Sequence, residues 1–246
     1  MIATPAWPPR SLPRLHVPPP LSEGVLVALD AAQANYLGNV LRLKEGSEVL
    51  LFDGVSGEWH ATIAEAGRKR MTLGVGARTR VQEMVPDLAL AFAPIKKGRI
   101  DWLVEKAVEL GVARLQPVIT QRTIVDKLNL ERMNAHIVEA AEQCGRTSLA
   151  TIEPPAKLDA FLRDRNAGRS LYFADETGGE PVQRAFVAGP ATILTGPEGG
   201  FTPAEATAIR AAPGARAISL GPRILRAETA ALAAVAAWMA SVGDWQ

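Results

Sequence analysis

LTGPEGGFTPAE, residues 194–205, decides the fold of this chain, because it runs from apolar residues through a Gly-Pro turn into a helical pattern. It contains three glycines that permit positive φ and a close approach of backbone to ligand, Gly196, Gly199 and Gly200. Thr202, followed by Pro203 and Glu205, has the pattern of a helix N-cap with proline at the first helical position. The stretch therefore predicts a rigid turn between a strand and a helix.

A second stretch, SLGPRILRAETAALAA at residues 219–234, repeats this plan about twenty residues later. Gly221 and Pro222 form the turn, and the final helix follows it. Arg223 and Arg226 lie at the N-terminal end of that helix, where the helix dipole favours anions and not cations. We therefore expect a functional role for at least one of the two arginines.

Neither turn has the features of a phosphate-binding loop. The Lys-Ser/Thr pair of a P-loop and the G-x-G-x-x-G spacing are both missing, and Glu198 would repel a phosphate. The residues favour a neutral or positively charged ligand held by backbone groups, although a plain strand-to-helix turn explains the first stretch about equally well.

From residue 79 onward, apolar strands alternate with amphipathic helices. LALAFAPI at residues 88–95 has the pattern of a buried strand, and RIDWLVEKAVELG at 99–111 that of a helix ending at Gly111. Such alternation predicts an α/β fold, a parallel sheet with helices on both faces. Ligands of these sheets bind at the carboxyl ends of the strands, which is where both glycine turns fall.

Residues 1–78 have a different pattern, of short strands broken by turn residues, which predicts a small β-barrel domain. One helix is expected at residues 30–43, with Asp30 as its N-cap. Four apolar residues of this helix are predicted to share one face: Ala34, Leu37, Val40 and Leu41.

The composition limits the remaining possibilities. The chain has 246 residues, and its formal net charge of +1 leaves no global signature of a nucleic-acid binder, so any basic surface must be local. Cys144 is the single cysteine, which excludes an intramolecular disulfide and a cysteine-built zinc site, and the three histidines are scattered. Because these residues offer no set of metal ligands, we expect a protein without a bound metal. No stretch has the pattern of a signal peptide or a membrane span, so we also expect the protein to be cytoplasmic.

LTGPEGGFTPAE together with LGPRILRAETA (residues 220–230) resembles the RsmE family of 16S rRNA (uridine-N3) methyltransferases in the SPOUT superfamily. The resemblance extends to residues 96–112, 139–146 and 35–54, in order along the chain. It therefore covers most of the sequence, and the paired C-terminal motifs are its most specific part.

This resemblance implies a SPOUT-type parallel sheet with a C-terminal trefoil knot. It divides the chain into a PUA-like RNA-binding barrel at residues 1–78 and a knotted methyltransferase domain at residues 79–246. It also implies a homodimer that methylates N3 of a uridine in 16S (small-subunit) rRNA, with S-adenosylmethionine (SAM) as methyl donor and no metal.

The resemblance also assigns the SAM site to the two glycine turns, because two loops would enclose one ligand in the knot. One wall would consist of residues from the first turn: Leu194, Thr195, Gly196, Glu198, Gly199 and Gly200. The other would consist of residues from the second: Ser219, Leu220, Gly221, Ile224 and Leu225.

Methylation of uridine N3 removes a proton and spreads negative charge onto O2 and O4. The site then needs a cation or hydrogen-bond donor near those oxygens and a proton acceptor. Arg226 is the first candidate for the cation and Arg146 the second. Glu228 is a candidate acceptor, directly or through water, and is equally explained as a first-turn helix residue.

Six basic residues are candidate RNA phosphate contacts: Arg42, Lys44, Lys96, Lys97, Arg99 and Arg122. Arg42 lies in the block shared with the family, although Asn35 of that block stands where the family commonly has histidine.

Three alternatives remain open. The first is a SPOUT enzyme that acts on a ribose 2′-oxygen or on a tRNA guanine. The ribose case is disfavoured, because RILRAET stands where the ribose enzymes have an Asn-Val-Ser block. A non-catalytic RNA-binding or ribosome-assembly protein would not need both glycine turns intact. A plain nucleotide-binding α/β protein lacks its phosphate motifs.

Overall fold

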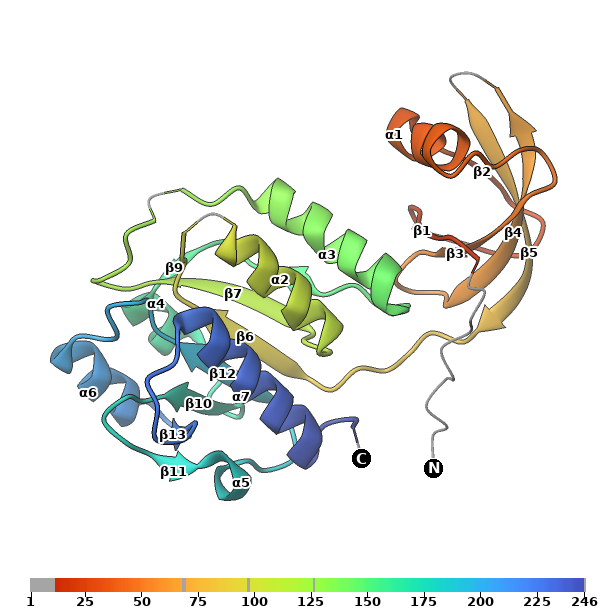
Figure 1. The fold of residues 1–246 in the computed structure, drawn as a ribbon. Coiled ribbons are helices and arrows are strands. Elements are labelled where there is room, and N and C mark those ends of the chain that lie inside the picture. Colours follow the sequence, from red (N-terminus) through yellow and green to blue (C-terminus); the bar gives the residue numbers. More distant parts are fainter. Residues whose placement is uncertain (1–11, 68–69, 97, 126, 246) are drawn as a thin grey trace. The chain divides into compact units, whose positions relative to one another are not determined.

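The computed structural model describes residues 12–67, 70–96, 98–125 and 127–245, and it divides into two units (Figure 1). The first unit comprises the chain up to Met84 together with the short segment Gly145–Ser148. The second comprises Val85–Cys144 and the chain from Leu149 onward.

The first unit is built on one five-stranded sheet with the strand order β1-β3-β4-β5-β2. β1 and β3 are parallel, and the other neighbouring pairs are antiparallel. The strands are β1 (Arg14–His16), β2 (Leu26–Ala28), β3 (Glu48–Phe52), β4 (Glu58–Ala66) and β5 (Met71–Arg80). Alternate residues of these strands point into a shared apolar core.

The predicted helix is present, and Asp30 is its N-cap. The Asp30 carboxylate accepts a hydrogen bond from the backbone N–H of Gln33 at 2.8 Å, and the Gln33 side chain accepts one from the Asp30 N–H at 3.3 Å. This capping box starts α1 (Ala31–Asn35).

The helix does not continue as an α-helix. It widens into a π-helical turn, η1 (Tyr36–Val40), and Arg42 follows with a φ of +57°. The predicted apolar face is therefore wrong at Val40, which is 61% exposed, because the wider turn rotates it away from the core. Ala34 and Leu37 are buried as predicted.

Glu58 lies at the centre of a charged cluster in the first unit. Its carboxylate accepts hydrogen bonds from Arg14 at 2.7 Å and from Arg80 at 2.9 and 2.6 Å. The same two arginines donate to the backbone carbonyls of Arg146 and Gly145, each at 2.7 Å. The cluster thereby holds the returning segment in the first unit.

The second unit contains an eight-stranded sheet in which every recorded pair of strands is parallel, as predicted. Its strand order is β11-β13-β10-β12-β6-β7-β8, and β9 pairs with β7. The strands are β6 (Leu88–Phe92), β7 (Arg114–Ile119), β8 (Thr151–Ile152), β9 (Ala156–Lys157), β10 (Ser170–Ala174), β11 (Glu180–Pro181), β12 (Ala191–Thr195) and β13 (Ala215–Ser219).

Helices cover both faces of this sheet (Figure 1). On one face α7 lies against β6, β10 and β12 and packs on α2, which in turn packs on α3. On the other, α4 and α6 share an apolar cluster with strand residues such as Phe173 and Leu194. The helices are α2 (Arg99–Glu109), α3 (Leu130–Cys144), α4 (Leu158–Asp164), α5 (Val182–Ala185), α6 (Pro203–Ala211) and α7 (Ala227–Val242).

The alanine-rich final helix, α7, packs onto the sheet. Val235, Trp238 and Met239 are buried, and the Trp238 indole is 1% exposed. Its indole N–H finds no hydrogen-bond partner in the described part of the chain. None of the helices in the described ranges is long and apolar enough to cross a membrane.

Candidate functional site

A cavity of about 540 Å³ opens at the carboxyl ends of β10, β12 and β13. Both glycine turns line it, so two stretches about twenty residues apart in sequence meet at one site, as predicted. The expected cofactor residues all lie on its wall except Leu194 and Gly199. Leu194 is fully buried under α4 and α6, and Gly199 is turned toward the Arg122 side chain.

The first turn is held rigidly from both sides. Thr202 caps α6 as predicted, since its hydroxyl accepts the Glu205 N–H, and Glu205 accepts the Thr202 N–H at 2.8 Å. The second oxygen of Glu205 accepts the N–H of Gln121 at 2.7 Å, and Arg122 donates to the Gly199 carbonyl at 2.5 Å. The turn after β12 is therefore tied to the loop after β7.

The second turn depends on Gly221, whose φ of +105° is one that side-chain-bearing residues rarely adopt. Ile224 beyond it is 91% exposed, an uncommon position for a branched apolar residue. Arg223 and Arg226 are exposed and line the cavity, and Arg226 occupies the N-cap position of α7 without making a side-chain cap.

A third wall, which the sequence analysis missed, comes from the end of β10. Phe173, Asp175, Glu176 and Thr177 all line the cavity. Asp175 accepts hydrogen bonds from the backbone and hydroxyl of Thr177 at 2.9 and 2.7 Å, and it pairs with Arg210. Burial acts to raise the pKa of the Asp175 carboxyl, but these bonds and the arginine charge outweigh it, so the pKa lies below its ordinary value. Because parallel strands end at one edge of the sheet, the residues after β10 could have been predicted to line the same site.

Glu228 lies in the first turn of α7 and is only 7% exposed. One of its carboxylate oxygens is 3.7 Å from Nε of Arg99, and the other has no hydrogen-bond partner among the described residues. It is absent from the wall of the cavity.

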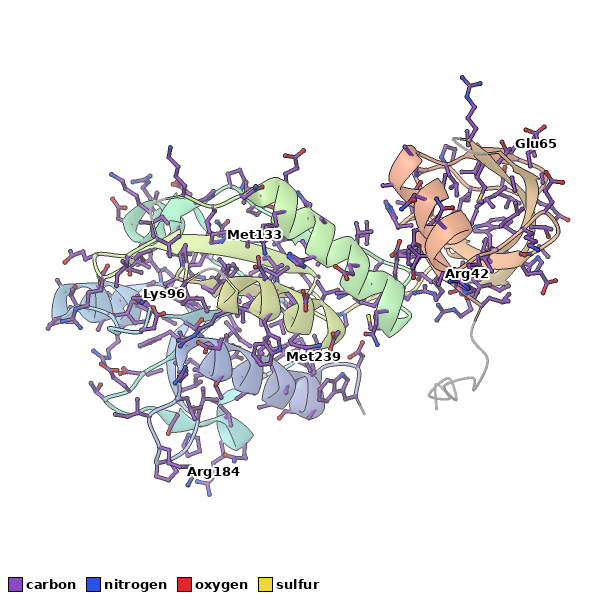
Figure 2. All side chains as sticks on the ribbon, turned by 45° about the horizontal axis from the view of Figure 1, so that its top comes forward. Arg42, Glu65, Lys96, Met133, Arg184 and Met239 are labelled. Carbon is purple, nitrogen blue, oxygen red and sulfur yellow. The ribbon has the colours of Figure 1, made fainter. Side chains whose placement is uncertain are left out.

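A smaller cavity of about 210 Å³ adjoins these loops. Its walls come from the loops after β6 and β7, from the first turn of α2, and from the turn after β12. The lining residues are Pro94, Lys96, Arg99, Ile124, Val125 and Glu198. Lys96 (labelled in Figure 2) and Arg99 thus line a second cavity at the same edge of the sheet.

The other predicted basic residues lie elsewhere. Arg42 (Figure 2) and Lys44 are exposed in the first unit, just beyond η1. Arg146 also belongs to the first unit and is 7% exposed; it donates to the Ser148 hydroxyl at 3.0 Å, and its Nε is 3.7 Å from Glu83. Arg146 lines neither cavity. Lys97 lies outside the described residues.

Comparison with known proteins identifies both parts of the chain. The model of an RNA methyltransferase domain matches residues 82–239, and that of an RNA methyltransferase PUA domain matches residues 29–75. The ribosomal RNA small subunit methyltransferase E of Rickettsia conorii is 30% identical over 229 residues, which cover 91% of this chain and 93% of that protein. The protein of the same name from Synechocystis is 32% identical, with 91% of this chain and 76% of that protein covered.

Two solved structures resemble this one over nearly its whole length. A ribosomal RNA small subunit methyltransferase E from Neisseria gonorrhoeae, bound to SAM, has a TM-score of 0.89 and 29% identity and covers 96% of this chain and 100% of that one. A protein from Legionella pneumophila, solved with the bound cofactor SAM, has a TM-score of 0.87 and 31% identity and covers 96% of this chain and 99% of that one.

Proposed function

This chain belongs to the ribosomal RNA small subunit methyltransferase E family, and from that premise we propose that it transfers a methyl group from SAM to N3 of a uridine in 16S rRNA. The observation that carries the proposal is the cavity of about 540 Å³ where two glycine turns converge. Methyl transfer from labelled SAM to small-subunit particles that lack uridine methylation, followed by nucleoside mass analysis, tests it. We expect 3-methyluridine. Label in a ribose or a guanine would contradict the target, and bound SAM without any transfer would contradict catalysis.

The walls of the larger cavity suit SAM. Three carboxylates line it, those of Asp175, Glu176 and Glu198, and negative charge near the ligand favours a sulfonium cation. Arg223 and Arg226 line the same cavity from the second turn. Phe173 and Leu225 offer apolar surface to an adenine ring, and the glycine turns allow backbone groups to approach it. When bound there, SAM supplies a methyl group that its sulfonium has already activated.

We propose that Arg226 stabilises the negative charge that develops on O2 and O4 of the uracil. It lines the cavity at the start of α7, and no hydrogen bond to another protein group is recorded for its guanidinium among the described residues. A preorganised cation at developing charge accelerates a reaction because it acts in the transition state more than in the ground state.

Replacement of Arg226 by alanine is expected to lower the single-turnover rate of methyl transfer about 10²-fold while SAM affinity changes little. Rapid-quench transfer and calorimetric SAM titration measure the two effects. Arg226→Lys keeps the charge and should recover part of the rate. Arg163→Ala, which removes an exposed arginine on α4, serves as the control. An Arg226→Ala enzyme with the wild-type rate and RNA affinity would eliminate this role.

For the two other predicted catalytic residues, we propose supporting roles. Glu228 is buried beside Arg99 and lines neither cavity, so it is placed to hold Arg99 and not to meet a substrate proton. Arg146 is engaged by Ser148 and Glu83 within the first unit, where it supports the returning segment.

We further propose that residues 1–78 bind RNA and that residues 79–246 carry out transfer. Arg42 and Lys44 are exposed cations beside the π-turn of the first unit, and Lys96, Lys97, Arg99 and Arg122 follow strands of the second. Contacts of this kind act on phosphates and weaken as salt increases. The match of residues 29–75 to a PUA domain supports the first assignment.

A homodimer in the cytoplasm completes the proposal. The outer side of α7 is apolar and only half-buried, and α2 beside it carries Trp102, which is 45% exposed. Apolar surface on two packed helices favours a self-complementary contact. The half-buried residues of α7 are Ala230, Leu232, Ala233, Ala236 and Ala237.

A further inference from the structure

The two cavities of the second unit share one lining residue among those that the structure describes, Glu198. It lies on the exposed part of the turn after β12, between the hollow that suits SAM and the smaller one. A methyl donor and a methyl acceptor must meet at one point, so the residue common to both hollows marks where the reacting atoms would lie.

The smaller cavity has the character of a site for one nucleobase. Its volume of about 210 Å³ is well under half that of the larger cavity, at about 540 Å³. Pro94, Ile124 and Val125 provide apolar surface, and Ile124 is 75% exposed, so a ring covering it would remove apolar area from water. Enzymes that act on a base inside RNA or DNA receive it unstacked, in a pocket of this kind.

The charged residues of this cavity match the edges of a uracil that loses its N3 proton. Lys96 and Arg99 line this cavity and Arg226 lines the larger one, so the three cations would together meet the negative charge that the N3 anion shares with the carbonyl oxygens on either side. The Glu228 carboxylate pairs with Arg99, at 3.7 Å from its Nε. The N3–H itself needs a proton acceptor, and Glu198 is the one carboxylate among the described residues that line this cavity.

We propose that the smaller cavity receives the uracil to be methylated and that Glu198 accepts its N3 proton, an inference that rests on the proposed function. In this step the N3–H bond breaks, an O–H bond forms on the Glu198 carboxylate, and the electron pair stays on N3. That pair then forms the bond to the incoming methyl carbon. Because Glu198 is exposed, it releases its proton to solvent after each turnover.

Among the residues that the structure describes, the other carboxylates near the site do not meet these conditions. Asp175 and Glu176 line the larger cavity alone, and Asp175 is already engaged by Thr177 and Arg210. Glu228 is buried and lines neither cavity. Glu198 therefore differs from the rest in facing both ligands.

Replacement of Glu198 by glutamine tests the proton transfer, because the amide keeps the shape and loses the basicity. With saturating SAM and RNA, the single-turnover rate should fall about 10²-fold. SAM affinity should weaken only modestly, because one of the carboxylates that face the sulfonium loses its charge, and saturation keeps that effect out of the measured rate; RNA affinity should stay unchanged. RNA with 5-fluorouridine at the target position should recover much of the rate, since its N3–H is more acidic. Glu180→Gln, at an exposed site on β11, is the matched control, and its single-turnover rate should equal that of the wild type.

Crosslinking tests the base site without relying on transfer. RNA with 5-iodouridine at the position identified by product analysis is irradiated on the enzyme in the presence of S-adenosylhomocysteine. Crosslinks should map to peptides containing residues 94–96 or 122–125, and Ile124→Ala should reduce them. This variant should remain folded because Ile124 is mostly exposed.

The outcomes separate the two levels of the proposal. If the wild type forms 3-methyluridine but Glu198→Gln is equally fast, or is slow and not recovered by 5-fluorouridine, the acceptor role is wrong and the function stands. Crosslinks mapping only to other parts of the chain would overturn the base site. A wild-type product other than 3-methyluridine would overturn the proposed function, and this inference with it.

Discussion

Replacing Glu58 with alanine is expected to lower the free energy of unfolding of the first unit by about 3–5 kcal/mol, because it leaves two arginines without their buried counter-ion. Glu58 is 4% exposed and accepts three hydrogen bonds from Arg14 and Arg80. These arginines also hold the carbonyls of Gly145 and Arg146, so the loss should spread to the returning segment. Amide hydrogen exchange of β3, β4 and β5 measures the effect locally.

The same residue gives this unit a dependence on pH. Burial acts to raise the pKa of the Glu58 carboxyl, but the bonds and charges of Arg80 and Arg14 outweigh it and hold the pKa below its ordinary value of 4.5. A lowered folded-state pKa stabilises the fold fully above the ordinary value, and this stabilisation is lost as the pH falls through the lowered one. The wild type should therefore lose protection in β3–β5 in acid, and Glu58→Ala should lose less.

Two substitutions control for this interpretation. Glu58→Gln keeps the shape and some of the hydrogen bonds but not the charge. The free energy of unfolding of its first unit should therefore lie between those of Glu58→Ala and the wild type. Glu48→Ala removes an exposed carboxylate that pairs with His60 at 3.2 Å, and it should cost less than about 1 kcal/mol. Equal protection in the Glu58→Ala protein and the wild type would show that the cluster does not stabilise the unit.

Trp238→Ala should destabilise the second unit by about 3–5 kcal/mol, because it leaves a cavity under α7 where the indole is now enclosed. Helix α7 lies on β6, β10 and β12, and Arg226 at its N-terminus lines the larger cavity, where we propose that SAM binds. We therefore expect lower protection of α7 and β12 in hydrogen exchange together with weaker SAM binding.

Trp238→Phe separates packing from hydrogen bonding. It retains most of the buried ring and removes an indole N–H that has no partner in the described ranges, so its cost should stay below about 1.5 kcal/mol. If phenylalanine were as damaging as alanine, the indole N–H would have to be contributing a bond, and packing would not explain the role of Trp238.

The sequence predicted those parts of the fold that depend on local patterns. A continuous apolar run indicated β6, the amphipathic pattern that stops at Gly111 indicated α2, and the Thr202 pattern indicated the capping box of α6. Because parallel strands end at one edge of the sheet, the sequence also predicted that the two glycine turns, about twenty residues apart, meet at one site. These predictions succeeded because the residues concerned determine backbone geometry within a few positions of themselves.

Other features depend on tertiary contacts and could not be predicted in this way. The π-turn at Tyr36–Val40 arises where Leu37 must reach the core of the first unit, and periodicity alone predicted a continuous helix that buried Val40. The smaller cavity needs loops from three separate strands, and none of them has a motif of its own. Its shared residue, Glu198, was assigned from the sequence to the cofactor alone.

The segment Gly145–Ser148 has a consequence for how the chain is connected. Because it belongs to the first unit while both of its flanks belong to the second, the chain crosses between the units at 84/85, 144/145 and 148/149. A single protease cut at 144/145 or 148/149 would leave the two units covalently joined through residues 84 and 85, whereas a cut at 84/85 would separate Met1–Met84 from Gly145–Ser148, the remaining part of its own unit. During synthesis, the first unit is complete only once residue 148 has left the ribosome, when α2 and α3 of its neighbour have already been made.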